Sequence, residues 1–376
     1  MKRNTEYLPE DLLVEILSRV PEASLARLRS TSKGWNTLIK KEERLAKKSL
    51  VVMLIHNRVY LVILDLHNDN IVKVISQFSL NDPLSSSSIE VDIRHVCHCD
   101  GLLLCTTMDE RLVVWNPCSG ETSRIIKPLN SKYSSDVYAL GKSSCNEYKI
   151  LRVHHHGDGF SFSCLVEYEI YDFTSNSWRV VGETTEWSLP GGWRHGGTSV
   201  DGNTYWLSRD FNQDCRPRLT TSLRCFDFST ERFGCVSLPV DHASYNLFAL
   251  SVTREEQKLC LLTSHAKTYD IINIWMATKI KTTGDMSWSK LLTVKRTHPT
   301  FTGISFLADR ENKVVVCPSK YENSSTRLHI VGTDKYTKVD HHGVGSKSSL
   351  PVMYDPTLVQ IQQGSLGIGT WKAPIT

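Results

Sequence analysis

Hydrophobic positions near the N-terminus recur with the period of an α-helix. Residues 8–21 read Leu-Pro-Glu-Asp-Leu-Leu-Val-Glu-Ile-Leu-Ser-Arg-Val-Pro. Steps of one, three, one and three join Leu12, Leu13, Ile16, Leu17 and Val20. Pro9 suits the first helical position because it has no N–H to leave unpaired, and Pro21 should end the helix. A helix this short is unstable alone, so we expect a partner inside the chain, outside it, or both.

Two more short helices are predicted before residue 48. Leu25 and Leu28 are three residues apart, and Trp35 begins a second set with Leu38 and Ile39. Thr31 or Ser32 can cap the third helix. Three helices in about forty residues enclose a very small core, so part of the first stripe should remain available to another protein.

From residue 49 the helical period gives way to short alternating strands. The longest apolar stretch, residues 50–66, is interrupted at positions 56–58 by His-Asn-Arg, which predicts a hairpin turn rather than a membrane span. A unit of strand, polar turn and strand then recurs. Its six turn anchors, separated by 50 to 56 residues, are Asp65, Asn116, Asp172, Asp227, Ala277 and Gly332.

A second marker, a polar turn that leads into a strand, precedes five of these units. The five turns begin near Cys99, Cys145, Asp201, Glu256 and Glu311. A period of ~50 residues with about four strands predicts a kelch-like β-propeller of about six blades over residues 49–362. Residues 354–362 are expected to pair with the first blade and close the ring, and residues 363–376 to form a loose tail.

The N-terminal pattern resembles an F-box of the plant type. The resemblance runs from Leu8-Pro9 to Leu38-Ile39 at fixed spacing, with departures at Ser32, where Cys is frequent, and at Gly34. It implies that residues 1–48 dock on the small SKP-type adaptor of a cullin–RING ubiquitin ligase. The adaptor-binding residues that it implies are Leu8, Pro9, Leu12, Leu13, Ile16, Leu17, Val20, Pro21, Leu25 and Leu28.

The remainder of the chain resembles the F-box-associated domain that follows the F-box in a large plant family. Segments that carry this likeness include Cys99-Asp-Gly-Leu-Leu-Leu-Cys, Val114-Trp-Asn-Pro-Cys-Ser-Gly, Asp201-Gly-Asn-Thr-Tyr-Trp-Leu and Phe226-Asp-Phe-Ser-Thr-Glu-Arg-Phe. The resemblance implies a kelch-like protein-interaction domain and leaves its ligand unidentified. The fold class expected is therefore mixed: a small all-α F-box followed by an all-β propeller.

Composition and charge narrow the setting. The eleven cysteines form no framework and no signal peptide precedes them, which favours reduced thiols in the cytoplasm or nucleus. The net charge of +4 falls entirely within residues 1–48. It can be a solvated helical surface, a site for an acidic protein, or a nucleic-acid patch, but a basic patch without a binding module is weak evidence for nucleic acid. We expect neither nucleic-acid nor membrane binding.

Motifs for chemistry are weak, so we expect no catalytic residue, cofactor or metal site. Leu140-Gly-Lys-Ser-Ser lacks the first glycine and the strand–helix context of a phosphate-binding loop. The run His154-His155-His156 can place at most two rings on one face of a strand. Cys97 and Cys99 share a face but have no second pair at zinc-finger spacing.

A Gly- and Pro-rich connection offers the best candidate for contact with a target protein. It contains Trp187, Trp193, Arg194 and His195, and Trp and Arg are frequent at binding hot spots. The alternative is that one Trp closes over the blade core and the glycines serve a tight turn.

Taken with these two resemblances, the sequence predicts a non-catalytic substrate receptor of an SCF-type ubiquitin ligase. One alternative is a propeller that binds a glycan or small molecule, and another is a propeller oxidase or hydrolase that requires a metal. A third is an F-box protein that binds the adaptor without delivering a target for degradation.

Overall fold

The structure is a computed structural model of the chain. The residues described below are 8–18, 20, 22–41, 49–66, 71–80, 90–117, 119–127, 136–156, 165–189, 197–211, 220–239, 245–254, 257–265, 268–280, 285–295, 306–318, 327–333, 335–340, 352–354, 357 and 359–361. No helix in this part of the chain is long and apolar enough to span a membrane.

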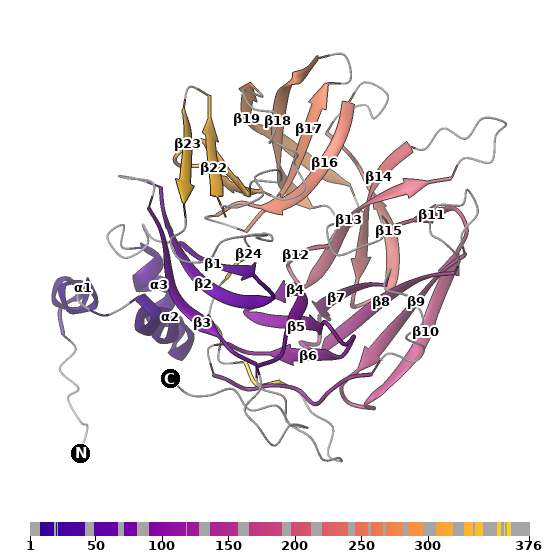
Figure 1. Ribbon diagram of the computed structural model, residues 1–376, viewed down its shortest axis with the longest axis horizontal. Coiled ribbons are helices and arrows are strands. Elements are labelled where there is room, and N and C mark those ends of the chain that lie inside the picture. Colours follow the sequence, from indigo (N-terminus) through magenta and orange to yellow (C-terminus); the bar gives the residue numbers. More distant parts are fainter. Residues whose placement is uncertain are drawn as a thin grey trace.

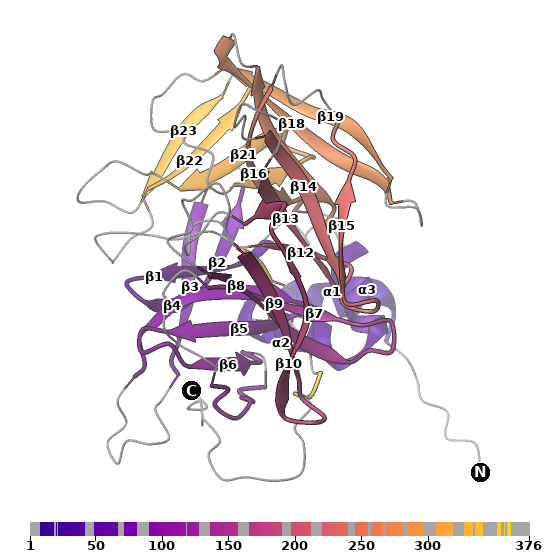
Figure 2. The same ribbon diagram turned by 90° about the vertical axis from the view of Figure 1, so that its right-hand side faces the viewer.

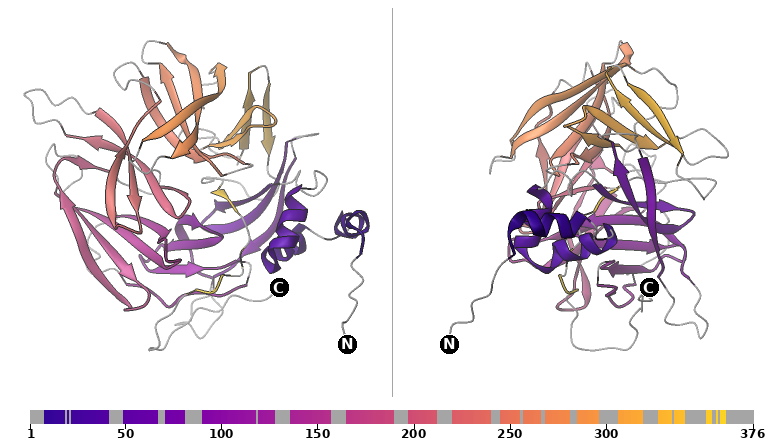
Figure 3. Two further views of the ribbon diagram at one scale, coloured as in Figure 1. Left: turned by 180° about the vertical axis from the view of Figure 1, so that it is seen from behind. Right: turned by 90° about the vertical axis from the view of Figure 1, so that its left-hand side faces the viewer.

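Three helices form the N-terminal unit, as the sequence predicts: α1 (Glu10–Ser18), α2 (Glu22–Thr31) and α3 (Lys33–Lys41). The Ser32 hydroxyl caps α3 by accepting the Trp35 N–H at 3.1 Å. Val14 and Leu17 of α1 pack with Ile39 of α3 to form the small core of this unit. Figure 3 shows the helices on the outside of the β-sheet ring, with α2 and α3 nearer to the ring than α1.

The rest of the described chain folds into six antiparallel sheets that follow one another around a ring, the blades of a β-propeller (Figures 1 and 2). Blade 1 contains β1 (Ser49–Ile55), β2 (Arg58–Asp65), β3 (Ile71–Phe78) and β24 (Val352–Met353); blade 2 contains β4 (Ile93–Cys99), β5 (Leu102–Thr107) and β6 (Leu112–Trp115). Blade 3 contains β7 (Val137–Lys142), β8 (Tyr148–His156), β9 (Leu165–Asp172) and β10 (Ser177–Thr184). Blade 4 contains β11 (Trp187–Ser188), β12 (Thr198–Val200), β13 (Asn203–Asp210), β14 (Thr220–Asp227) and β15 (Arg232–Val236). Blade 5 contains β16 (Tyr245–Val252), β17 (Leu259–His265), β18 (Thr268–Ile280) and β19 (Met286–Lys295); blade 6 contains β20 (Leu307–Asp309), β21 (Val314–Pro318), β22 (Arg327–Gly332) and β23 (Tyr336–Asp340).

The polar turns of the repeat lie between paired strands, because their residues tolerate the left-handed backbone that tight hairpins require. Asn57, Asp100, Asn146 and Asp201 all have positive φ, at 61°, 49°, 64° and 51°. Five of the six predicted turn anchors fall at or beside a hairpin turn or, for blade 2, at the end of β6. The prediction at Ala277 was wrong. This residue lies within β18, which continues to residue 280 and contains a bulge after Ala277.

The hydrophobic core lies mainly between neighbouring blades. In one cluster, side chains of β1 and β2 in blade 1 pack against those of β4, β5 and β6 in blade 2. Between blades 3 and 4 the packing is so close that a Cβ on Gly141 would lie 2.0 Å from the Phe228 ring. Each apolar face of a sheet is therefore buried by the next blade rather than by helices.

Ion pairs also join blades 3 and 4. Glu231, in the β14–β15 turn, accepts hydrogen bonds from Lys149 Nζ at 2.8 Å and from Arg179 Nη2 at 2.5 Å. Burial alone would raise the pKa of Glu231, but these hydrogen bonds and the positive charges of Lys149 and Arg179 together outweigh it and hold the pKa below its usual value.

A strand from the C-terminal end of the chain completes blade 1. Val352 and Met353 of β24 pair with Val52 and Val51 of β1. A C-terminal strand does join the first blade, but the prediction that residues 354–362 form it was wrong: β24 ends at Met353, and the described residues from 354 to 361 are not in a strand. Residue 362 and the predicted tail, 363–376, lie outside the described residues.

Candidate protein-interaction surfaces

Helix α1 exposes an apolar stripe. Leu12 and Ile16 of α1 follow Leu8, which lies two residues before the helix, at four-residue spacing. Each is exposed by just over half, at 51%, 51% and 52%. The helix begins where the Pro9 carbonyl accepts the N–H groups of Leu12 and Leu13, both at 3.1 Å. Exposure of large aliphatic side chains to water is unfavourable, and their burial against another protein lowers the free energy. A surface of this kind therefore favours protein contact.

The opposite side of α1 belongs to the bundle. Val14 is 8% exposed and Leu17 is 3% exposed, and both pack in the three-helix core. Leu17, one of the residues predicted to bind the adaptor, therefore lies in the bundle core, and its contact with an adaptor stays a prediction. The stripe in the sequence was broader than one face, because a helix that anchors a bundle and also meets a partner needs apolar residues on two sides.

The remaining residues of the predicted adaptor set divide into three groups. Pro9 is exposed next to the stripe, and Leu13 is half-buried. Leu25 and Leu28 are half-buried and pack against the bundle core, while Val20 is half-buried between α1 and α2. Pro21 lies outside the described residues.

Trp187, from the predicted target-binding set, is a core residue. It is 4% exposed, its ring lies 4.7 Å from that of Phe233, and the Arg224 guanidinium lies 4.6 Å above it. The structure therefore supports the alternative in which one Trp closes over the blade core. The other three members of that set, Trp193, Arg194 and His195, lie outside the described residues.

His154, the first residue of the histidine run, belongs to a buried polar network in blade 3. His154 Nδ1 lies 2.7 Å from Asp136 Oδ1, and Arg152, which is 1% exposed, binds Asp136 through Nη2 at 2.7 Å and Glu169 through Nη1 at 2.9 Å. His154 and His156 share one face of β8, with ring centroids 4.6 Å apart, as the alternation of a strand requires. These groups compensate one another's burial, which is how charged side chains are tolerated inside a fold.

The two cysteines singled out in the sequence are buried thiols. Burial raises the pKa of Cys97 and of Cys99 to about 12, so both stay protonated near neutral pH. Cys97 Sγ donates to the Tyr138 carbonyl at 3.2 Å. Within the described ranges, no three His, Cys, Asp or Glu side chains gather in a group that could hold a metal ion.

The sequence did not indicate one structurally important contact, which is made by Asn116. Asn116 marked only a turn there, yet its side chain is fully buried and binds the C-terminal segment. The signal available was the Asn-Pro-Cys-Ser-Gly turn itself, which does not reveal a partner about 240 residues away.

Comparison with known proteins supports both units. The F-box domain family matches residues 6–47, and the F-box associated beta propeller domain family matches residues 50–361. Two relatives from Arabidopsis thaliana, named Putative F-box proteins At4g10190 and At3g21130, are each 50% identical to this chain. Each alignment includes 96% of this chain, together with 100% of the first relative and 99% of the second. The F-box/kelch-repeat protein At3g17530 of the same plant is 39% identical, with 95% of each chain aligned. The chain therefore belongs to the plant F-box proteins that carry an F-box-associated β-propeller domain.

Proposed function

We propose that this protein is the substrate-recognition subunit of an SCF-type cullin–RING ubiquitin ligase. In this proposal α1 docks on an SKP-type adaptor and the propeller holds a target protein. The observation that carries it is the exposed row of Leu12 and Ile16 on α1, with Leu8 just before the helix, while the opposite side of α1 is anchored in the bundle. Burial of each of these side chains would contribute about 1.5–3 kcal/mol.

The chain itself would perform no bond chemistry. Its contribution is proximity: a target lysine is kept near a ubiquitin-charged enzyme that the rest of the complex recruits. The most deeply buried charged groups of blade 3 support a structural role, because Arg152 is bound to Asp136 and Glu169 rather than presented in a cleft. Free thiols are present at Cys97, Cys99, Cys105, Cys145, Cys225, Cys235 and Cys317, which supports a reducing compartment, the cytoplasm or nucleus.

The test is adaptor pull-down with the double variant Leu12→Asp, Ile16→Asp. We expect loss of adaptor binding, because two charged carboxylates would be buried in an apolar interface. The matched control is Met108→Asp with Val180→Asp, which makes the same kind of change at propeller side chains that are 47% and 55% exposed. Adaptor binding that survives in the α1 variant, or that is lost equally in the control, would refute the proposed role of α1.

The propeller's role requires a separate measurement. Proximity labelling from the full chain, with and without proteasome inhibition, should enrich target proteins that accumulate only when the proteasome is blocked. The α1 double variant should label the same proteins in both conditions, since its propeller is intact and its link to the ligase is cut. Labelled proteins whose amounts ignore proteasome inhibition in the unmodified chain would favour a non-degradative role.

A further inference from the structure

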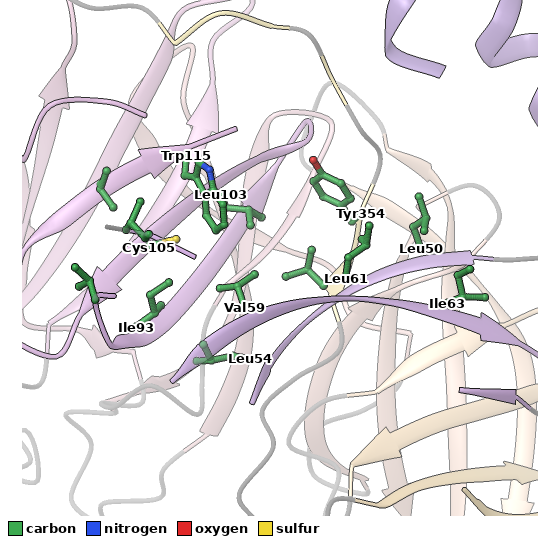
Figure 4. Close-up of a cluster of buried hydrophobic side chains, with 14 residues drawn as sticks. Leu50, Leu54, Val59, Leu61, Ile63, Ile93, Leu103, Cys105, Trp115 and Tyr354 are labelled. Carbon is green, nitrogen blue, oxygen red and sulfur yellow. The ribbon is translucent and has the colours of Figure 1, made fainter. Parts of the chain in front are cut away.

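The C-terminal segment crosses from blade 1 to blade 2. After β24, the Tyr354 N–H donates to the Leu50 carbonyl of β1 at 3.1 Å. The Tyr354 ring is 2% exposed and belongs to the cluster between the two blades, where it lies between Leu50 and Leu61 on one side and Leu103 and Trp115 on the other (Figure 4). The segment is thus fixed at its start by both backbone and side chain.

Its far end is held by the polar turn that follows β6. Asn116 is fully buried, and its Nδ2 donates to the carbonyl of Thr357 and to that of Val359, both at 3.0 Å. The Ile361 N–H donates to Glu121 Oε1 at 3.1 Å, and the Ile361 side chain is buried among residues of blades 2 and 3. We call the described residues between 352 and 361 the C-terminal strap.

The strap is joined to blade 1 through few backbone pairs. Strands β1 and β2 pair through seven residue pairs and are joined by a two-residue turn, whereas β24 pairs with β1 through two. Pairing a strand from the other end of the chain also has an entropic cost, because it closes a loop that spans the whole propeller. Side-chain hydrogen bonds from blade 2 compensate for this, and Asn116 supplies two of them at a site closed to water.

We propose that the C-terminal strap is a latch, that Asn116 keeps it closed, and that it releases as one unit while the blades stay folded. Release would leave the β24-facing backbone edge of β1 unpaired, and an unpaired strand edge is a template for another strand. It would also loosen the strand that follows the helices, since β1 begins at Ser49, soon after α3 ends at Lys41. The latch thereby controls how rigidly the helical unit is joined to the ring.

Hydrogen exchange of the full chain, followed by mass spectrometry of peptides, tests this. In Asn116→Ala, we expect peptides that cover 49–55 and 352–361 to exchange roughly tenfold to thirtyfold faster and in step. Loss of two hydrogen bonds of ordinary strength implies a factor of about that size. Peptides of blades 4 and 5 should keep their rates.

The matched control is Asn203→Ala. Asn203 Oδ1 accepts the Phe228 N–H at 3.2 Å, so this variant also removes a side-chain bond to backbone beside a blade turn, but in blade 4. It should leave the exchange of 49–55 and 352–361 unchanged.

Asn116→Asp keeps the test valid if Asn116→Ala does not fold. The aspartate retains the oxygen that accepts the Ser119 N–H at 3.3 Å, and so preserves the turn, but it faces the two strap carbonyls with an acceptor. We expect it to release the latch at least as far. Unchanged exchange in this variant, separate rates for the two segments, or acceleration of all blades together would overturn the latch.

Discussion

The buried polar network of blade 3 gives the sharpest prediction about stability. In Asp136→Asn, the Arg152 guanidinium loses its nearest carboxylate, whose oxygens lie 2.7 Å from Arg152 Nη2 and from His154 Nδ1. The carboxylate is 6% exposed and the Arg152 side chain 2% exposed, so water cannot replace the lost charge. Removal of one partner from a buried ion pair costs about 3–5 kcal/mol.

The expected cost lies at the lower end of that range, about 3 kcal/mol, because two interactions remain. Arg152 keeps its 2.9 Å ion pair with Glu169, and the amide oxygen of the new Asn can still accept a hydrogen bond. The assay is equilibrium urea unfolding followed by tryptophan fluorescence, with the free-energy change taken from the shift of the midpoint at constant slope.

Asp109→Asn is the matched control. Asp109 pairs with Arg111 at 2.7 Å, almost the same distance, but its carboxylate is 56% exposed. Exposed pairs of this kind contribute about 0–1 kcal/mol. A cost below about 1 kcal/mol for Asp136→Asn, or equal costs for the two variants, would refute the reasoning that burial makes the blade 3 network important.

Three further predictions concern packing and charge. Gly141→Ala should lower the free energy of unfolding of the propeller by about 1–3 kcal/mol, measured in urea, because the new Cβ would overlap the Phe228 ring. In Gly234→Ala the new Cβ meets nothing within 4 Å, so this variant should not be destabilised. Equal effects of the two substitutions would contradict this. The pKa of Glu231 is lower in the folded than in the unfolded chain, so its charged form stabilises the fold above the unfolded pKa. This stabilisation is lost as the pH falls through the folded pKa. Glu231→Gln should therefore flatten the loss of stability below about pH 4.5. An acid unfolding curve as steep as that of the unmodified chain would disprove that role. Leu17→Ala should destabilise the helical unit by about 2–5 kcal/mol, measured by thermal loss of helical circular dichroism, while Ala at an exposed stripe residue should change little; the reverse order would place Leu17 on the surface.

Local pattern predicted the elements well. The three helices, the change of period at residue 49 and the polar hairpin turns each depend on residues close together in sequence, so their signals survive without tertiary information. The error at Ala277 shows the limit of this approach. A bulge shifts the register of β18 against β19, and no spacing rule along one strand can show that a longer strand continues through it.

The candidate site could be predicted only in part from the local sequence pattern. The apolar stripe of α1 was evident, but not which of its members face the bundle: Leu12 is half exposed and Leu17, five residues on, is 3% exposed. Trp187 had the composition of a binding residue and is nevertheless buried beneath Arg224, because a neighbouring strand and ring pack over it.

By itself, then, the sequence determined the two units, their order, the repeat of about six blades and the helix that offers an apolar surface. Each follows from periodicity or from turn chemistry, which act over a few residues. Only the tertiary structure decided which residues of the C-terminal segment close the ring, which charges are buried together, and that Asn116 holds a segment 241 to 243 residues further along the chain. These contacts join residues that are remote in sequence, and they exist only once the blades have brought them together.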